Sequence, residues 1–441
     1  MHVILASVGT DGDIFTYLGL GAVLRSRGHR VTLAAPETYR GRAEGAGFSF
    51  CSLVSTADVE RMLASPDLMR SIRGGLMMAR WGGPMIARQY EQLAGLVAES
   101  GGRGIGNRQS AVGPEEIRGL VAKNRMLDGG CLMVANPGLL AARLVQEKLG
   151  VPMASLVLQP GIIASCVRPP VMPGGMTIPR WFPHWLRKAY WWNVDVTGGF
   201  LVSPWLNRQR RKLGLRPVRR LFRWWLSPQL VIGLFPSWYA QPQSDWPPQM
   251  RLAGFGRYDG ASAELAPELR AFCESGSPPI AFTLGTGMRH AGEFFREAAQ
   301  ACEALGMRGI LLSKFAEVIP KSLPESVCYC SFAPFRELLP LCSAVVHHGG
   351  IGTTAAALEA GCPQLIWSLA WDQPDNGARV ESLGVGLSLP VRRRTGIYFQ
   401  QWLKRVLHES IATRAQDVAR RARGENGFEV AAGMVERLER K

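Results

Sequence analysis

The segment HHGGIGTT, residues 347–354, stands where an apolar strand passes into a helix. Residues 344–346, Ala-Val-Val, predict the end of a buried strand, and the alanine-rich residues 355–359 predict a helix. Glycines in such a turn let a ligand approach the backbone, and free N–H groups at a helix start favour an anion. The histidines and threonines add hydrogen-bond donors. We interpret the turn as a cradle for a diphosphate; a tight connection that only needs small residues is the alternative.

A second unit of the same kind opens the chain. Residues 2–8, HVILASV, predict a buried strand, GTDGD breaks it, residues 14–27 have a helical pattern, and HRVTLAAP (29–36) predicts the next strand. This β-turn-α-β order is typical of a parallel sheet with helices on both faces. Further strands are predicted at 131–136, 152–158 and 230–235, and in a second series at 279–285, 308–313, 326–332, 343–350 and 363–369.

The sequence therefore predicts an α/β protein with two doubly wound halves. We expect an N-terminal domain at residues 1–235, a linker rich in Pro, Gly and aromatic residues at 236–260, and a C-terminal domain at 261–395. Helices in residues 396–441 are expected to pack back toward the N-terminal domain. A chain of 441 residues is too long for one ordinary core, which agrees with this division.

Composition narrows the class of protein. The chain is 47% hydrophobic, yet no apolar run approaches the roughly 20 residues that span a bilayer, and no signal peptide is recognised. Its nine cysteines are scattered, which favours reduced thiols in a cytoplasmic protein and no metal site. The net charge of +16 favours an anionic partner, with a solvated basic surface as the alternative.

The spacing of the glycine turns weighs against two nucleotide-binding classes. Neither SVGTDGDI (7–14) nor TLGTGM (283–288) has the G-x-G-x-x-G spacing of dinucleotide-binding folds. No lysine follows a glycine loop in the manner of a P-loop. The sequence is therefore unlike an NAD-dependent dehydrogenase and unlike a P-loop NTPase.

The chain resembles the inverting nucleotide-sugar glycosyltransferases built from two facing Rossmann-like domains, the GT-B type. SVGTDGD (7–13) is similar to the G-S-R-G-D opening of the sterol and glycopeptide enzymes, and residues 332–380 are similar to the donor-binding signature of the whole family. Segments 210–222, 234–247 and 347–364 also resemble the bacterial rhamnosyltransferase of rhamnolipid synthesis. The resemblance implies a nucleotide-sugar donor that is a substrate, and no cofactor or metal.

Asp13 takes the position of the family's catalytic base. A carboxylate that accepts the proton of an acceptor hydroxyl contributes about 10²- to 10⁴-fold to the rate. The alternative is that Asp13 only caps the helix expected to begin at Ile14. Asp11 is the second candidate base, and its charge is expected to act on the pKa of Asp13.

The resemblance also implies a set of residues that bind the nucleotide sugar. They are Thr286, Phe332, Ala333, His347, His348, Gly349, Gly350, Gly352, Thr353, Asp372 and Gln373. One imidazole is expected to serve the diphosphate; spacing favours His348, and His347 stays open. Phe332 is expected to stack on the base, with a core phenylalanine as the alternative, and Asp372 and Gln373 to bind sugar hydroxyls, with a plain polar loop as the alternative.

The substrates are predicted only by class. Ala356 stands where many UDP-sugar enzymes have a glutamate for the ribose, which favours a dTDP-sugar and makes dTDP-L-rhamnose a candidate donor. An apolar or amphipathic acceptor, such as a hydroxy-fatty-acid lipid or a natural product, fits the methionines of residues 62–85, and Met77, Met78 and Met85 are the candidate contacts. Core filling is the alternative for these methionines. A nucleotide-sugar epimerase of the same fold and a non-catalytic lipid-binding protein are the competing functions.

Residues 180–225 combine seven tryptophans with eleven Lys or Arg residues. This composition predicts peripheral contact with an anionic membrane, at its cytoplasmic face. Nucleic acid is not expected as a partner, because no nucleic-acid-binding fold is recognised. Arg210, Arg211, Arg219 and Arg220 are the basic residues expected to contact the membrane. A buried tryptophan cluster with a solvated basic face is the alternative.

Overall fold

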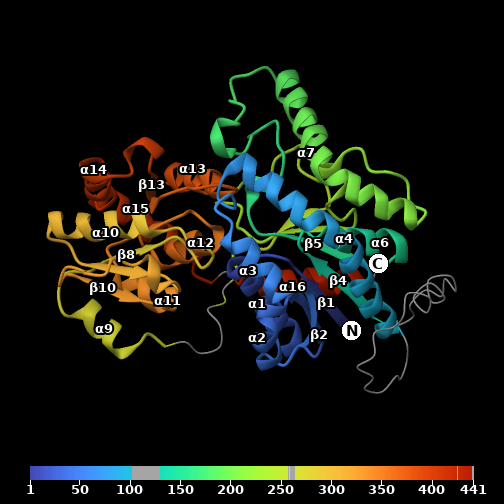
Figure 1. Cartoon of the computed structure of the whole chain (residues 1–441), viewed down its shortest axis with the longest axis horizontal. Helices are drawn as coiled ribbons and strands as arrows, with labels where there is room; N and C mark the ends of the chain where they lie inside the picture. Colours follow the sequence, from blue (N-terminus) through green and yellow to red (C-terminus); the bar gives the residue numbers. More distant parts are fainter. Residues whose placement is uncertain (102–129, 257, 259–263, 425, 440–441) are drawn as a thin grey trace.

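The computed structural model describes residues 1–101, 130–256, 258, 264–424 and 426–439. Within them the chain forms two sheets, and the strands of each sheet pair only in parallel. The sheets belong to two lobes that lie side by side, with the first half of the chain in one lobe and residues from about 264 in the other (Figure 1). The predicted fold class, two doubly wound α/β domains, is confirmed.

The first sheet has the strand order β3-β2-β1-β4-β5-β6-β7. Its strands are β1 (His2–Ala6), β2 (Arg30–Pro36), β3 (Ser49–Val54), β4 (Cys131–Ala135), β5 (Met153–Val157), β6 (Leu230–Gly233) and β7 (Met250–Leu252). The helices around it are α1 (Asp11–Ser26), α2 (Arg40–Gly45), α3 (Thr56–Ala64), α4 (Ser71–Gly101), α6 (Leu140–Leu149), α7 (His184–Lys212) and α8 (Leu221–Trp224). Every residue of β1, β4 and β5 is buried, because helices cover both faces of the sheet.

The second sheet has the order β10-β9-β8-β11-β12-β13. Its strands are β8 (Ile280–Thr283), β9 (Gly309–Leu312), β10 (Val327–Cys330), β11 (Ala344–His347), β12 (Gln364–Ile366) and β13 (Gly386–Ser388). Its helices are α9 (Pro267–Glu274), α10 (Gly292–Leu305), α11 (Phe335–Leu338), α12 (Ile351–Ala360), α13 (Gln373–Leu383), α14 (Gly396–Val406) and α15 (Glu409–Ala422). Phe282, Phe294, Trp367 and Phe399 pack in its core.

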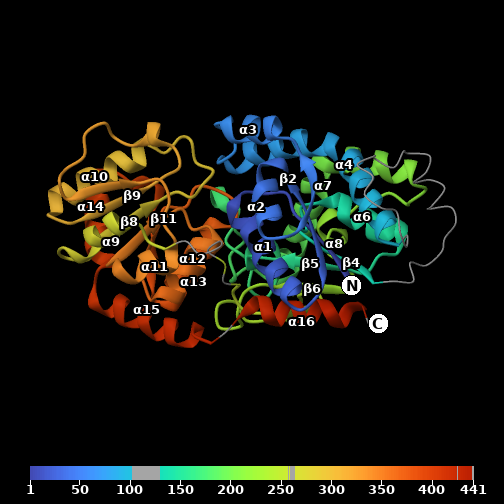
Figure 2. The same ribbon diagram turned by 90° about the horizontal axis from the view of Figure 1, so that it is seen from below.

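The chain ends on the opposite lobe. Helix α16 (Gly427–Glu439) lies under the first sheet beside α1 (Figure 2), where Phe428 and Val435 are buried in the core of the N-terminal domain. His29 pairs with Glu436 of α16 at 2.9 Å. The helices in residues 396–441 were expected to pack back toward the N-terminal domain, and only α16 packs fully on it. Helix α14 belongs to the core of the C-terminal domain, and α15 lies on α12.

The structure differs from the sequence-based division at the linker. Strand β7 lies within residues 236–260, so part of the expected linker belongs to the first sheet. Residues 257 and 259–263, where that linker was expected to end, lie outside the described residues. Strands β3, β7 and β13 were not predicted, and β7 and β13 are only three residues long. Helix α1 begins at Asp11 rather than at Ile14.

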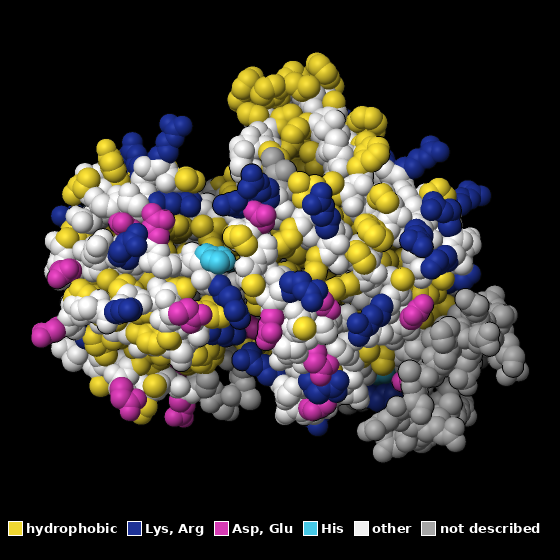
Figure 3. Space-filling model, in the orientation of Figure 1, with side chains coloured by type: hydrophobic (Ala, Val, Ile, Leu, Met, Phe, Trp, Pro, Cys, Tyr) yellow, Lys and Arg dark blue, Asp and Glu magenta, His cyan; other side chains and the backbone are white. Residues whose placement is uncertain are grey.

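Helix α7 is the element that departs most from the compact two-lobed body. Its N-terminal end and the segment before it project from the N-terminal lobe (Figure 1). Hydrophobic side chains cover that projecting end (Figure 3). No helix among the described residues is both long and apolar enough to cross a membrane.

Candidate active site

The glycine turns of the C-terminal domain meet because their strands are neighbours. Strand β8 pairs with β11, with Thr283 opposite His347, and the chain turns away from the two strands on opposite sides of the sheet. Residues 284–287 and 348–350 therefore follow adjacent strand ends at the switch point of the sheet, where doubly wound folds bind ligands. A Cβ atom on Gly285 would lie 2.8 Å from Cε1 of His348, so the two turns are in direct contact.

His347 is a buried residue of the sheet. Its Nε2 lies 3.0 Å from Oε1 of Gln364, and its Nδ1 accepts a hydrogen bond from the backbone N–H of Gly349 at 3.2 Å. The side chain has no exposed surface, and burial lowers its pKa to about 3. Both ring nitrogens of the neutral imidazole are occupied within the protein, so His347 has no free donor for a ligand.

His348, by contrast, has an unsatisfied nitrogen. Its ring lies between the turns at Gly285 and Gly350, and its buried Nδ1 atom has no hydrogen-bond partner among the described residues. Burial lowers the pKa of His348 to about 4, so the ring is neutral at physiological pH and carries one N–H. Of the two candidate histidines, only His348 keeps part of its surface exposed and has a ring nitrogen without a partner.

The start of α12 completes this side of the cleft. Gly349 has φ of +89°, a conformation that favours glycine, and a Cβ there would lie 2.7 Å from Ile366. Gly350 is the N-cap residue of α12, and a Cβ on Gly352 would meet open space. Thr353 is 8% exposed, and the backbone N–H groups at this helix start have no side-chain cap. Such a helix end favours an anion.

Asp13 stands on the opposite domain, after β1. It is the third residue of α1, and Oδ2 accepts a hydrogen bond from the backbone N–H of Thr10 at 3.2 Å. The side chain keeps part of its surface open to solvent, although protein atoms surround it. That burial raises the pKa of Asp13 to about 6, while the bond from Thr10 lowers it. Asp13 therefore helps to cap the start of α1, although the N-cap residue itself is Thr10.

Asp11 joins the two domains. Its carboxylate accepts a hydrogen bond from the hydroxyl of Tyr39 at 2.7 Å and forms an ion pair with Lys314, which follows β9 in the other domain. Although burial alone raises the pKa of Asp11, the hydrogen bond from Lys314 is the chief of several contacts that hold it below its usual value. The shift in the pKa of Asp13 comes from its burial and from the hydrogen bond with Thr10.

A cavity of about 230 Å³ opens between the domains beside this ion pair. Thr10 and Thr286 both line it, from the β1–α1 turn and from the turn after β8. A Cβ on Gly287 would lie 3.6 Å from Cγ2 of Thr10, so these turns face each other across the cleft. Thr286 thus lines this cavity from the C-terminal domain, and Asp13 is hydrogen-bonded to Thr10 on the opposite wall.

Asp372 is the N-cap residue of α13 and lies under the same turn as His348. The side-chain amide of Asn376 donates to Oδ2 of Asp372 at 2.8 Å and to the carbonyl of Gly349 at 2.9 Å. Burial raises the pKa of Asp372 to about 7, and the negative charge of Asp13 adds to this rise. Asn376 was not singled out from the sequence. It fixes the position of Asp372 relative to the glycine turn.

Gln373 and Trp371 flank this carboxylate. Oε1 of Gln373 accepts hydrogen bonds from the backbone N–H groups of Leu369 and Ala370, at 2.6 and 3.0 Å, which leaves its amide N–H groups for a ligand. Trp371 has φ of +59°, which is unfavourable for a large side chain. Its indole Nε1 donates to the carbonyl of Leu68, in the N-terminal domain, at 3.1 Å. Trp371 was also missed, since nothing local in the sequence marks a left-handed backbone.

Phe332 has the exposure of a stacking surface. Its side chain is 49% exposed, although it is a large hydrophobic residue just after β10. This exposure excludes a core position for Phe332. Ala333 beside it is buried. An exposed aromatic ring at a strand end can stack on a base.

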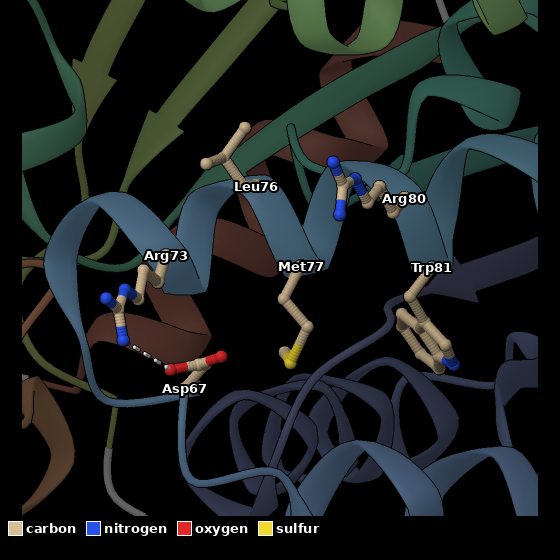
Figure 4. Close-up of a pocket in the computed structure, with 6 residues that line it drawn as sticks. All are labelled: Asp67, Arg73, Leu76, Met77, Arg80 and Trp81. Carbon is tan, nitrogen blue, oxygen red and sulfur yellow. Dashed lines mark ion pairs between the residues drawn. The ribbon is translucent and has the colours of Figure 1, made fainter.

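The candidate acceptor methionines divide into two groups. Met77 lines a cavity of about 440 Å³ with Asp67, Arg73, Leu76, Arg80 and Trp81, and in Figure 4 it points to the same side of α4 as Trp81. Met85 packs against the core of the N-terminal domain, as the alternative reading expected. Met78 is half-buried. Trp371 reaches this region, because a Cβ on Gly74 of α4 would lie 3.2 Å from its ring.

The described residues contain no cluster of metal ligands. Across the described ranges, no group of three or more His, Cys, Asp or Glu residues is arranged to hold a metal ion. All nine cysteines are free thiols.

Comparison with known proteins agrees with this geometry. Residues 312–435 match a family model described as erythromycin biosynthesis protein CIII-like, C-terminal domain. The O-mycaminosyltylonolide 6-deoxyallosyltransferase of Streptomyces fradiae is 27% identical over 450 residues, which cover 99% of this chain and 97% of that protein.

Two solved structures are similar over their full length and over all of this chain. They are the spinosyn forosaminyltransferase, with a TM-score of 0.67 at 19% identity, and the spinosyn rhamnosyltransferase complexed with thymidine diphosphate, with a TM-score of 0.60 at 18% identity. These structures share the fold of two facing parallel-sheet domains. The chain is a glycosyltransferase with the GT-B fold.

Proposed function

We propose that the protein is an inverting glycosyltransferase that moves a hexose from a dTDP- or UDP-sugar to a hydroxyl of an apolar or amphipathic acceptor. One observation carries the proposal. Asp13 and Asp372 come from different domains, yet they are close enough for the charge of one to act on the pKa of the other. Beside Asp372, on the same glycine turn, lies an imidazole with a free nitrogen. A base, a sugar-binding carboxylate and a phosphate donor thus share one cleft.

Asp13 is the proposed base. With a pKa of about 6 its carboxyl group is mostly ionised at neutral pH, and it is more basic than an ordinary aspartate. It accepts the proton of the acceptor hydroxyl as that oxygen attacks the anomeric carbon. The bond between this carbon and the diphosphate oxygen breaks at the same time. Attack from the face opposite the leaving group inverts the anomeric configuration.

The leaving diphosphate gains negative charge in this step. Backbone N–H groups at the start of α12 and the neutral N–H of His348 are the proposed donors to it, with Thr286 and Thr353 as further hydroxyl donors. Fixed donors of this kind favour the charge that develops in the transition state without any rearrangement. His348 is preferred over His347 because His347 already uses both nitrogens.

The donor is proposed to lie along the C-terminal domain. Phe332 stacks on the base, the backbone of Ala333 reads its edge, and Asp372 with the amide of Gln373 binds the sugar hydroxyls. Support for a thymidine nucleotide comes from the structurally similar spinosyn rhamnosyltransferase, which was solved with thymidine diphosphate, and from Ala356 in place of a ribose-binding glutamate. We name dTDP-L-rhamnose as the first donor to test.

The acceptor is proposed to enter from the N-terminal domain. The cavity beside Met77 and Trp81 offers apolar surface on α4 for such an acceptor. The similar enzyme of Streptomyces fradiae acts on a tylonolide derivative, which supports a bulky natural product as readily as a hydroxy-fatty-acid lipid.

The experiment is acceptor-dependent release of nucleoside diphosphate. Purified protein is incubated with dTDP-L-rhamnose, dTDP-glucose or UDP-glucose and a panel of hydroxylated lipids and macrolide aglycones. We expect release only with an acceptor, and a product whose anomeric configuration, measured by NMR, is opposite to that of the donor. Retained configuration would contradict the roles given to Asp13. Release or epimer formation without an acceptor would favour an epimerase.

A further inference from the structure

We propose that the projecting end of α7 docks the enzyme onto an anionic lipid bilayer. The surface concerned, called the α7 tip, consists of Met176, Trp181, Trp185 and Trp192, which are 38%, 78%, 69% and 53% exposed. Trp185 and Trp192 are seven residues apart on a helix and lie on one face. Figure 3 shows that hydrophobic side chains form a cap on this end of the molecule. Exposed indoles gathered at a protruding point are unusual unless they meet a partner.

The base of the α7 tip is rigidly held, so its exposure is part of the fold. Trp191, in contrast to its neighbours, is half-buried, and its Nε1 donates to the carbonyl of Ser165 at 2.9 Å. Arg187 donates to the carbonyl of Cys166, and the hydroxyl of Tyr190 donates to the carbonyl of Met176. These bonds join α7 to the segment that precedes it. They present the tip as one preformed surface.

The charge around the tip identifies the partner. Residues 148–244 contain thirteen Lys or Arg residues and a single acidic residue, Asp195. Asp195 is buried and pairs with Arg220 at 2.8 Å, so it offers no negative charge to a partner. Asp245 lies just beyond this range and accepts hydrogen bonds from Ser165 and Cys166 at the base of the tip. Tryptophan with an excess of basic residues is the composition of segments that lie in the headgroup region of anionic membranes. A protein partner would more commonly need a mixed polar rim.

The structure also shows which Lys and Arg side chains are exposed and can contact an anionic surface. Arg168, Arg180 and Lys188 are exposed beside the α7 tip. Arg210, however, is only 3% exposed and donates two hydrogen bonds to Glu147, both at 2.8 Å. The expected membrane contact is therefore wrong for Arg210, whereas Arg220 is partly exposed and pairs with Asp195. Arg211 and Lys212 are exposed, but they lie about 40 Å away, at the far end of the helix of 29 residues.

The tip is connected to the cleft by its own preceding segment. This segment leaves β5 at the end that faces the other domain, and the backbone N–H of Val171 donates to Oδ1 of Asp375, on the first turn of α13. Asp372 caps the same helix. If the proposed function holds, a lipid acceptor would pass from the bilayer along this segment to Asp13. Docking itself requires no transfer activity, so the two proposals can fail separately.

Vesicle binding of the full chain tests the docking. Vesicles of phosphatidylcholine alone and of phosphatidylcholine with phosphatidylglycerol are sedimented with the protein, at low salt and at about 1 M salt, where the Debye length is about 3 Å. We expect at least tenfold more protein on the anionic vesicles at low salt. Tryptophan emission should shift to shorter wavelength on binding, and brominated lipids should quench it. This readout needs no variant.

Three variants locate the contact. The triple change Trp181→Ser, Trp185→Ser and Trp192→Ser should reduce binding at least tenfold, and Arg180→Gln with Lys188→Gln should do so at low salt. The matched apolar control is Ile397→Ser with Tyr398→Ser, on the C-terminal domain, where these side chains are 60% and 52% exposed. The matched charge control is Arg211→Gln with Lys212→Gln. Both controls should bind like the wild type, and thermal unfolding checks the fold of every variant.

Several results would overturn the proposal. These are no binding to anionic vesicles at low salt, equal binding to neutral ones, an absent emission shift, or equal losses in the control variants. Self-association that disappears in the triple tryptophan variant, measured by sedimentation velocity, would assign the tip to a second copy of the chain instead of a bilayer.

Discussion

Asp13 and Asp372 face the same cleft from opposite domains. Burial raises the pKa of Asp372 to about 7, and the charge of Asp13 adds to that rise, although the two residues are separated by most of the chain. Burial also raises the pKa of Asp13, to about 6. Two carboxyl groups with raised pKa values in one cleft are a common feature of catalytic sites, and they make the reaction sensitive to pH.

The first prediction concerns that sensitivity. Because a base must be ionised to accept a proton, transfer should fall as the pH drops through about 6, where Asp13 becomes protonated. The measurement is kcat/KM for the acceptor between pH 5 and 8, at constant ionic strength. Asp11→Asn is the control, since the pKa of Asp11 is lowered and its loss should leave the inflection in place. A rate that is flat across this range would contradict the role of Asp13.

The second prediction is that Asp13→Asn abolishes transfer without loss of donor binding. Asparagine keeps an oxygen that can accept the backbone N–H of Thr10, so the start of α1 should remain capped. Removal of the base should lower kcat by about 10²- to 10⁴-fold. The affinity for dTDP, measured by calorimetry, should stay as in the wild type. If turnover is unchanged at saturating acceptor, Asp13 only caps the helix.

The third prediction separates the two histidines. His348→Ala should weaken dTDP binding by about ten- to a hundredfold, as expected for one hydrogen bond to a charged group, and leave thymidine binding unchanged. His347→Ala should instead lower the melting temperature, because Gln364 and the N–H of Gly349 would lose their buried partners. Calorimetry with both ligands and thermal unfolding of both variants decide the matter. The opposite pattern would move the phosphate role to His347.

The fourth prediction concerns the base. Phe332→Ala should weaken thymidine and dTDP by the same factor, equivalent to about 1–3 kcal/mol, because stacking does not involve the phosphates. Phe332→Trp should retain binding. Since Phe332 is half exposed, neither change should alter thermal stability much. A loss confined to dTDP would show that Phe332 does not contact the base.

The fifth prediction is a gain of stability. The folded-state pKa of Asp372, about 7, lies above the ordinary aspartate value of 3.8, so its ionised form destabilises the fold at pH 8. This cost shrinks as the pH falls through about 7 and is gone below about 4. Asp372→Asn should therefore melt at higher temperature than the wild type at pH 8, and at the same temperature near pH 4. Asp417→Asn, at an exposed ion pair, is the matched control and should change little at either pH.

The parts of the site that the sequence predicted are local. Glycine-rich turns after apolar strands mark strand ends by their own composition, which is why the segments around Asp13, Thr286 and His348 were found. Their partners were not, because contact depends on how the domains meet. Lys314 reaches Asp11, and Trp371 reaches Leu68, each across 303 positions of the chain.

The choice between His347 and His348 shows the same limit at short range. His347 is the last residue of β11, so the strand directs its side chain into the layer beside Gln364. His348 follows in the turn and points to the neighbouring turn at Gly285. Two adjacent imidazoles have identical chemistry in a sequence. The point at which the strand ends gives them different environments, and strand ends are poorly defined by sequence pattern.

The last helix has a mechanical consequence. The polypeptide passes from β7 to α9 in one direction and returns from α15 to α16, so the chain crosses between the lobes twice. The second crossing adds a covalent restraint on how far the two lobes can separate when donor and product exchange. Removal of α16 would take away one connection and uncover the core around Phe428, so the freedom gained would come with a weakened N-terminal domain.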